Sequence, residues 1–419
     1  MMDINSDEKS VVVIGAGIVG LSVALKLHSE GYKITIIDRN EPMEGCSAGN
    51  AGFLSESNIF PPATKDILLK LPGMLISKQG PLIISPTYLN RMLPWTLKAA
   101  ATLNKNKFDK IVDAFSSLIT RSQTALHQLS EISGSRHFIT SEGGLVCFIT
   151  EEAFQARIAK IPLWREKGIS VRVMDAQETR EMEPDLTENV VGSLFFGNSG
   201  RCSNPQGLGL SYFSYLIENG VKFIRDKINN IQSDNNNNWI VDGELANYTA
   251  SNVICCAGYH SETLLSKFKI KRNVVSERGY HLMLPDSGVN LNRPIVFGEP
   301  YFAATPMEHG LRLAGTAEFA SPDLPANYGR ATMLKDLAKK YLPHLNTDNA
   351  VPWMGIRPTL PDGLPAIGEI SGHHGLFYAY GHGHNGLMTS AITAECVASL
   401  IGRRESPVDL QPFSITRFS

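Results

Sequence analysis

Hydrophobic residues fill positions 11–14, a run of the length of a buried strand, and a glycine-rich turn follows it. Residues 18–30 then have the apolar spacing of a helix, and Gly31 stands where a glycine commonly ends one. A second apolar run covers residues 33–38. The pattern predicts a strand, a helix and a second strand in direct succession, as in a parallel α/β sheet.

The rest of the chain alternates between helical and strand spacing. Residues 276–320 have the pattern of antiparallel strands, and residues 58–107 mix prolines, short apolar clusters and mostly basic charges. Further helices are expected at residues 108–132, 152–168, 205–219 and 387–401, and a short buried strand at 252–258.

Length and composition limit the class of protein. A chain of 419 residues exceeds what one hydrophobic core usually serves, so we expect two domains. The net charge of −2 gives no global basic field for nucleic acid, and six scattered cysteines without a CxxC pair fit reduced thiols. The polar N-terminus does not resemble a signal peptide, and no apolar run approaches the roughly 20 residues of a membrane span. A cytoplasmic protein is expected.

Three glycines occupy the turn between the first strand and the first helix. Gly15 allows the tight turn, Gly17 lets the backbone approach a pyrophosphate, and Gly20 lets the helix and strand pack closely. Asp38 ends the second strand, where a carboxylate holds a ribose hydroxyl and disfavours a 2′-phosphate. The arrangement predicts that the chain binds FAD or NAD rather than NADP.

Three further stretches decide between these dinucleotides. They are "CSAGNAGFL" from position 46, "NVICCAGYHSETL" from position 252, and the pair "GIRPTLPDGLPAIGEI" and "GLFYAYGHGHNGL" between positions 355 and 387. Together they resemble the FAD-dependent D-amino-acid oxidase superfamily, above all its bacterial D-amino-acid dehydrogenases, with glycine oxidase as a relative. An enzyme that used only NAD would have no reason to return to its cofactor near the C-terminus.

The resemblance implies an α/β fold with two domains. A Rossmann-like FAD-binding domain with a parallel sheet is expected from residues 10–60, 150–270 and 350–419. A substrate-binding α+β domain with a mixed, largely antiparallel sheet is expected from residues 61–149 and 271–349.

Noncovalent FAD is implied as well, because no cysteine lies between Cys256 and Cys396, where some relatives tether their flavin. Glycines at 381–386 would bring main-chain amides at the start of the last helix to the flavin, and Asn385 would cap that helix. The predicted FAD-binding residues are Gly15, Ala16, Gly17, Ile18, Val19, Gly20, Asp38, Arg39, Ser47, Asn50, Ala51, Gly52, Ala257, Gly258, Gly381, His382, Gly383, Asn385, Gly386 and Leu387.

The flavin of such enzymes accepts a hydride, so no side-chain base is assigned. Arg357 is the candidate that binds the substrate carboxylate, because a planar guanidinium matches a carboxylate with two hydrogen bonds; the alternative is an ordinary salt bridge. Tyr301 is either a pocket residue or a core aromatic, and His384 is expected to face the substrate. Tyr280 and His281 are weaker pocket candidates.

Four histidines near the C-terminus also allow a metal site to be considered. His382 and His384 lie between glycines, and His373 and His374 fit a turn before the last strand. No acid or cysteine stands at ligand spacing among them, so no metal is predicted.

The resemblance implies that the protein oxidises a small amino acid, either a D-amino acid or a cyclic secondary amine such as D-proline or 4-hydroxy-D-proline, to an imino acid. Electrons would pass to a quinone or another acceptor than oxygen. The basic, apolar residues 58–107 either rest on the cytoplasmic face of the inner membrane or simply cover the substrate pocket. A glycine- or sarcosine-type oxidase and a non-catalytic FAD- or NAD-binding sensor remain alternatives.

Overall fold

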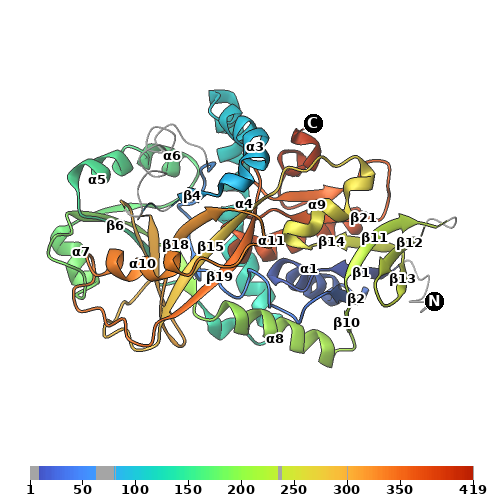
Figure 1. Cartoon of the computed structure of the whole chain (residues 1–419), viewed down its shortest axis with the longest axis horizontal. Coiled ribbons are helices and arrows are strands. Elements are labelled where there is room, and N and C mark those ends of the chain that lie inside the picture. Colours follow the sequence, from blue (N-terminus) through green and yellow to red (C-terminus); the bar gives the residue numbers. More distant parts are fainter. Residues whose placement is uncertain (1–8, 63–79, 81, 235–237, 300, 419) are drawn as a thin grey trace.

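The computed structural model describes residues 9–62, 80, 82–234, 238–299 and 301–418. Figure 1 shows an elongated molecule with a parallel sheet in its right half and a larger mixed sheet in its left half. The six-stranded sheet has the order β10-β2-β1-β14-β21-β20, and all its neighbours are parallel except β20 and β21. Its strands are β1 (Ser10–Ile14), β2 (Lys33–Asp38), β10 (Lys222–Arg225), β14 (Asn252–Cys255), β20 (Ala366–Glu369) and β21 (Leu376–Tyr380).

Both faces of this sheet are covered, as the continuous apolar strands require. Val11 and Val13 of β1 pack into the helical layer, whereas Val12 and Ile14 point to the opposite face. The helical layer consists of α1 (Ile18–Ser29), α4 (Lys105–Ile132), α8 (Pro205–Glu218) and α11 (Gly386–Ile401). The opposite face packs against the antiparallel strands β11 (Ile228–Ser233), β12 (Trp239–Gly243) and β13 (Asn247–Ala250).

A nine-stranded mixed sheet forms the other half of the molecule, with the order β19-β15-β18-β17-β16-β6-β8-β7 and β4 paired to β18. Helix α10 (Gly329–Ala338) packs on it around Tyr280, Phe297 and Tyr341. The strands are β4 (Leu82–Ile84), β6 (Gly144–Phe148), β7 (Arg172–Asp175), β8 (Gly192–Phe196), β15 (Val275–Leu284), β16 (Ile295–Phe297), β17 (Phe302–Met307), β18 (Gly310–Phe319) and β19 (Val351–Thr359).

Shorter elements complete the described chain. A small sheet contains β3 (Phe53–Leu54), β9 (Gly200–Cys202) and β5 (Ile139–Thr140). The remaining helices are α3 (Leu89–Ala101), α5 (Glu151–Ile158), α6 (Ile161–Glu166), α7 (Ala176–Met182) and α9 (Ser261–Leu264). The short 3-10 helices are η1 (Pro86–Tyr88), η2 (Arg136–Phe138), η3 (Gly258–His260), η4 (Ser266–Phe268), η5 (Gln411–Phe413) and η6 (Ile415–Phe418).

The predicted combination of a parallel sheet with a mixed, largely antiparallel sheet is confirmed. The sheets do not follow the expected domain boundaries, however, because β7, β8 and β19 pair within the mixed sheet although their ranges were assigned to the FAD domain. The division into domains stays a prediction. The helix expected at 152–168 is two helices, since Pro162 opens α6 and cannot continue α5.

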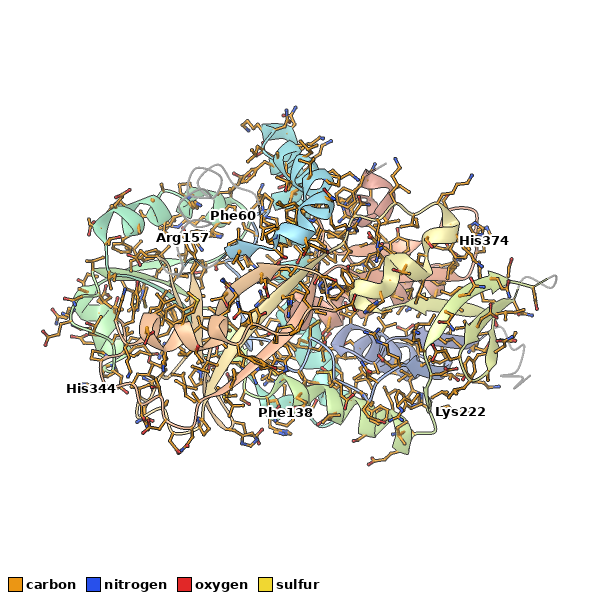
Figure 2. The ribbon with its side chains drawn as sticks, viewed as in Figure 1. Phe60, Phe138, Arg157, Lys222, His344 and His374 are labelled. Atoms are coloured by element: carbon orange, nitrogen blue, oxygen red, sulfur yellow. The ribbon has the colours of Figure 1, made fainter. Side chains whose placement is uncertain are left out.

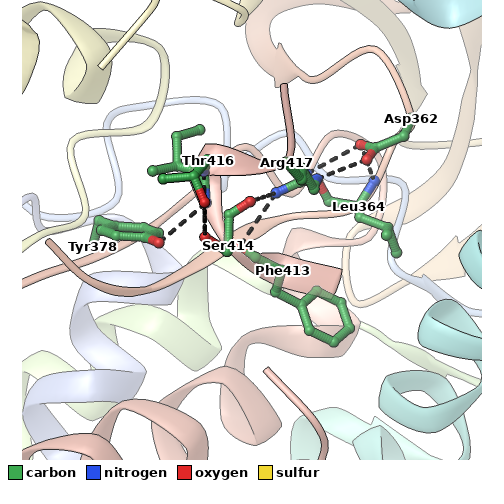
Figure 3. Close-up of polar contacts among 8 residues, drawn as sticks. Asp362, Leu364, Tyr378, Phe413, Ser414, Thr416 and Arg417 are labelled. Carbon is green, nitrogen blue, oxygen red and sulfur yellow. Dashed lines mark hydrogen bonds and ion pairs between the residues drawn. The ribbon is translucent and has the colours of Figure 1, made fainter. Parts of the chain in front are cut away.

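The C-terminal segment is attached to the loop that follows β19 (Figure 3). Arg417 Nε donates to Asp362 Oδ2 over 2.7 Å, and the same guanidinium donates to the carbonyl oxygen of Leu364. Asp362 Oδ1 also accepts from the amide of Leu364, a bond that is typical of aspartate in a turn. The tail therefore fixes the turn that carries the chain from β19 back to the parallel sheet.

Candidate functional site

A cleft of about 890 Å³ lies between the two large sheets. One wall contains the carboxyl ends of β1, β2 and β14, where α/β sheets commonly bind ligands. The opposite wall contains residues of β15 and β19. All the predicted FAD-binding residues and pocket candidates line this cleft except Gly20, Gly52 and His281.

Glycine is required at two positions of the turn before α1. Gly15 has a φ of +115°, and a Cβ on it would lie 2.4 Å from the carbonyl oxygen of Cys256. A Cβ on Gly20 would lie 1.9 Å from the carbonyl oxygen of Gly15, so Gly20 acts in packing and not in the cleft itself. Gly17, Ile18 and Val19 do line the cleft, and the N-terminus of α1 therefore faces it.

Asp38 lies at the end of β2 with its carboxylate beside the glycine turn. Its Oδ2 accepts from the amide of Ala16 over 2.7 Å, and its Oδ1 accepts from the amide of Asn40. These bonds fix the carboxylate at the position where an FAD ribose is expected. Arg39 is exposed and lies 2.8 Å from the Nε2 atom of His260, another residue of the cleft.

The loop after β2 is held from both sides of the cleft. Ser47 Oγ accepts from the amide of Ile18 at the start of α1. From β18, Arg312 donates to the carbonyl oxygens of Ala48 and Asn50, and burial lowers the pKa of its guanidinium to about 10. Gly52 supports the loop from outside the cleft, with its carbonyl oxygen accepting from the amide of Cys202.

The second predicted backbone cradle begins α11. Gly386 and Leu387 line the cleft, so this N-terminus faces it as that of α1 does. Asn385 occupies the cap position but makes no capping bond; its side chain instead accepts from Asn58. The predicted cap position is confirmed, but the side-chain capping bond is absent. His382 is buried, which lowers its pKa to about 3, and contacts Thr393 Oγ1.

Three cross-strand pairs form the wall made by β15 and β19. His281 stacks on Trp353 with ring centroids 4.8 Å apart, and Gly279 faces Gly355. Next to this glycine pair, Glu277 faces Arg357. A Cβ on Gly279 would lie 2.3 Å from the guanidinium carbon of Arg357, so the glycine leaves the space that this side chain occupies.

Glu277 is the centre of a polar network on this wall. Its Oε1 accepts from Arg357 Nη1 over 3.0 Å and lies 2.8 Å from His384 Nε2, while its Oε2 accepts from Thr359 Oγ1. Burial alone would raise the pKa of Glu277, but the charges of His384 and Arg357 and the bonds from His384 and Thr359 lower it below its usual range. Arg357 is thus ion-paired and 21% exposed, with guanidinium donors still available to a ligand.

The aromatic candidates have different positions. Tyr301 lines the cleft, is 39% exposed and has an unusual φ of +54°. Tyr280 lines the cleft as predicted, but its ring packs in the core beneath α10 and its hydroxyl bonds to Glu318. His281 lies outside the cleft and contacts the carbonyl oxygen of Gly49. The contacts of Tyr280 and His281 are those of structural residues.

The four C-terminal histidines do not gather into one site. His382 and His384 have the separate partners described above, His373 packs against Phe268, and His374 lies 3.7 Å from Glu369. Within the described residues no group of three histidine, cysteine, aspartate or glutamate side chains is arranged to hold a metal ion.

Several residues that shape the cleft were missed by the sequence analysis. They include Glu277, Arg312, Trp353 and Arg157. The period-two alternation of Glu277, Gly279 and His281 could have placed these three residues on one face of a strand. The antiparallel pairing with β19, on which the network depends, has no local signal in the sequence.

Comparison with known proteins identifies the family to which this architecture belongs. Residues 10–400 match the family model described as DAO, FAD dependent oxidoreductase. The chain belongs to this family. The DAO match confirms the resemblance inferred from the sequence and identifies the chain as an FAD-dependent oxidoreductase, which argues against the non-catalytic sensor.

Relatives cover nearly the whole chain. A D-amino-acid oxidase of Bradyrhizobium diazoefficiens is 31% identical over 98% of this DAO chain and 99% of its own. A D-amino acid dehydrogenase of Helicobacter pylori is 25% identical over 97% and 98% of the two chains. Glycine oxidase from Geobacillus kaustophilus shares the fold with a TM-score of 0.77 and 22% identity over 97% of this chain and 98% of its own.

The residues present fit the FAD that the family uses. A side chain at Gly15 would collide with the backbone of Cys256, and Gly17 has only the hydroxyl of Ser47 within contact distance, so main chain borders the cleft there. Two helix N-termini and the Asp38 carboxylate provide the groups that a pyrophosphate, a flavin edge and a ribose require.

Replacing Glu277 with glutamine tests the polar network. Loss of its charge should lower the free energy of unfolding by about 1–3 kcal/mol at neutral pH, because Arg357 and His384 lose a shared partner. Since the folded-state pKa of Glu277 is lowered, its contribution is complete above its usual value of 4.5 and disappears as the pH falls through the folded pKa. Denaturant unfolding at several pH values would measure both effects.

Glu41→Gln is the matched control, since Glu41 forms an exposed ion pair with Arg225. That change should cost less than about 1 kcal/mol. Equal destabilisation by the two substitutions would contradict a special role for Glu277.

Proposed function

We propose that this protein is an FAD-dependent dehydrogenase of a small D-amino acid, including cyclic secondary amines such as D-proline and 4-hydroxy-D-proline. Bound FAD would supply the hydride acceptor for the substrate Cα, with an imino acid as the product. The observation that carries this proposal is Arg357, held by Glu277 in the cleft wall opposite the dinucleotide turn.

Arg357 is suited to bind the substrate carboxylate. Glu277 engages its Nη1 and restricts the guanidinium to one orientation, so less conformational entropy is lost when a carboxylate binds. His384 lies beside it and is exposed to the cleft, where it would contact the part of the substrate next to the carboxylate. Tyr301 provides a further cleft-lining phenol.

The remaining residues position these groups and exclude water. The stacked pair of His281 and Trp353 holds the loop at Gly49, and burial keeps the pKa of His281 near 3, so this pair is uncharged at neutral pH. No described side chain is assigned as a base, because a substrate amine that enters neutral needs none. Binding and orientation of the carboxylate and Cα are therefore the tasks of this chain.

Anaerobic mixing of the yellow holoenzyme with single amino acids tests the proposed reaction. D-Alanine, D-proline or 4-hydroxy-D-proline should bleach the flavin absorbance, whereas the matching L-enantiomers should not. Glycine and sarcosine must be included, because bleaching by these compounds alone would support the glycine- or sarcosine-type oxidase instead. No bleaching by any D-amino acid would contradict the proposal.

Replacing Arg357 with alanine tests the carboxylate site. The Michaelis constant for the best substrate should rise by at least about tenfold, since a charge-assisted bond is lost, while the FAD content stays near that of the wild type. Steady-state kinetics and the flavin-to-protein absorbance ratio measure the two quantities. An unchanged Michaelis constant would show that the carboxylate binds elsewhere.

The electron acceptor is a separate proposal, supported by the surface of α3. Leu89, Leu93 and Leu97 follow one another at helical spacing and are 52%, 65% and 66% exposed. The opposite side of α3 is anchored, with Trp95 Nε1 donating to the carbonyl oxygen of Thr359 and Arg91 to that of Val274. Figure 1 shows α3 projecting from the top of the molecule.

Helix α3 thus packs beside the start of β15 and the end of β19 on one side and presents a leucine stripe on the other. Lys105, Lys107 and Lys110 are exposed just after it. Leucines beside cations are the pattern of a helix that rests on an anionic bilayer, where a quinone would be within reach. No helix of the described residues is long and apolar enough to span a membrane. Residues 63–79 of the same segment lie outside the described residues.

Vesicles of anionic phospholipid that contain a quinone test this surface. The wild type should sediment with them and reduce the quinone faster than it reduces oxygen. Leu93→Ser with Leu97→Ser should weaken binding by at least about tenfold, because buried apolar area is lost. Leu245→Ser, at a residue 78% exposed on another part of the surface, is the control. Rapid peroxide formation without vesicle binding would favour an oxidase, as the Bradyrhizobium relative is named.

A further inference from the structure

Arg157 is a cationic residue of the cleft that the proposed reaction does not use. It lies on α5, in the half of the molecule that carries the mixed sheet, where Figure 2 labels it. Arg157 belongs to the lining of the same cleft as Arg357. In the order of the mixed sheet, β6 beside α5 is separated from β19 by four other strands, so the two arginines approach the cleft from different ends.

The guanidinium of Arg157 has no acidic partner among the described residues. Its Nε is buried without a hydrogen-bond partner, and burial lowers the pKa of the side chain. Each of the other lysine and arginine residues that line the cleft has a polar side-chain partner. Arg39 contacts His260, Lys227 pairs with Glu244, and Arg357 pairs with Glu277.

A partly buried cation without a counter-charge is costly unless a ligand provides one. The guanidinium carbon of Arg157 lies over the ring of Trp164, 5.2 Å from its centroid, in a cation–π contact. Tyr301 is close enough to interact with it electrostatically and adds a hydroxyl donor to the same region of the cleft. Between this region and Arg357 the lining includes the apolar residues Val146, Val296 and Phe302.

We propose that Arg157, with Tyr301, is a second anion subsite that binds the distal carboxylate of an acidic D-amino acid. This proposal rests on the proposed function, in which Arg357 binds the α-carboxylate. Because the two arginines approach the cleft from different ends, the longer side chain of D-glutamate fits better than that of D-aspartate. The apolar residues between them would contact the methylene groups of that side chain.

Substitution of Arg157 tests the subsite with D-glutamate, D-glutamine and D-alanine as substrates. The wild type should show a kcat/KM for D-glutamate at least about tenfold above that for D-glutamine, and Arg157→Gln should remove this preference. Arg157→Lys, which keeps the charge, should retain part of it. Arg165→Gln, at an exposed arginine on the neighbouring α6, is the control and should retain all of it.

A wild-type preference that survives Arg157→Gln would overturn the subsite, as would an equal loss of kcat/KM for all three substrates. Binding of glutarate and butyrate to the oxidised holoenzyme, followed by the change in the flavin spectrum, requires no turnover. Glutarate should bind at least about tenfold more tightly than butyrate to the wild type but not to Arg157→Gln. This result would support the subsite even if no D-amino acid were oxidised, and equal binding of both acids to the wild type would contradict it.

Discussion

The substrate side of the cleft depends on the interactions of one ionised carboxylate, that of Glu277. It is buried on β15, and three donors from β19 and the loop before α11 converge on it. Because that loop also carries the glycines expected to face the flavin, the same carboxylate connects the two large sheets. A neutral residue in its place would leave Arg357 without a fixed orientation.

The cofactor side could be predicted from the sequence because its signals are local. Gly15, Gly17 and Asp38 lie within one strand–helix–strand unit, and the structure brings all three to the cleft. Chain geometry alone fixes such a turn, since a side chain at Gly15 would collide with the backbone of Cys256.

The substrate side could be predicted only in part. Arg357 was recognised through its motif, but its pairing with Glu277 arises from strands that are about eighty residues apart in the chain. The positions of Arg312 and Arg157 depend in the same way on tertiary contacts. Long-range pairing also explains why β7, β8 and β19 lie in the mixed sheet although their ranges were expected in the FAD-binding domain, since an isolated strand pattern does not identify its partner.

The charged residues of the cleft bear on which substrates the protein can bind. Glu277 compensates Arg357, whereas no described acid pairs with Arg157. A crystal structure of the FAD complex with bound propionate would test the account most directly. We predict the propionate carboxylate about 2.7–3.2 Å from the free N–H groups of Arg357, with the contact between Arg357 and Glu277 intact. A carboxylate bound away from Arg357, or Arg357 released from Glu277, would contradict it.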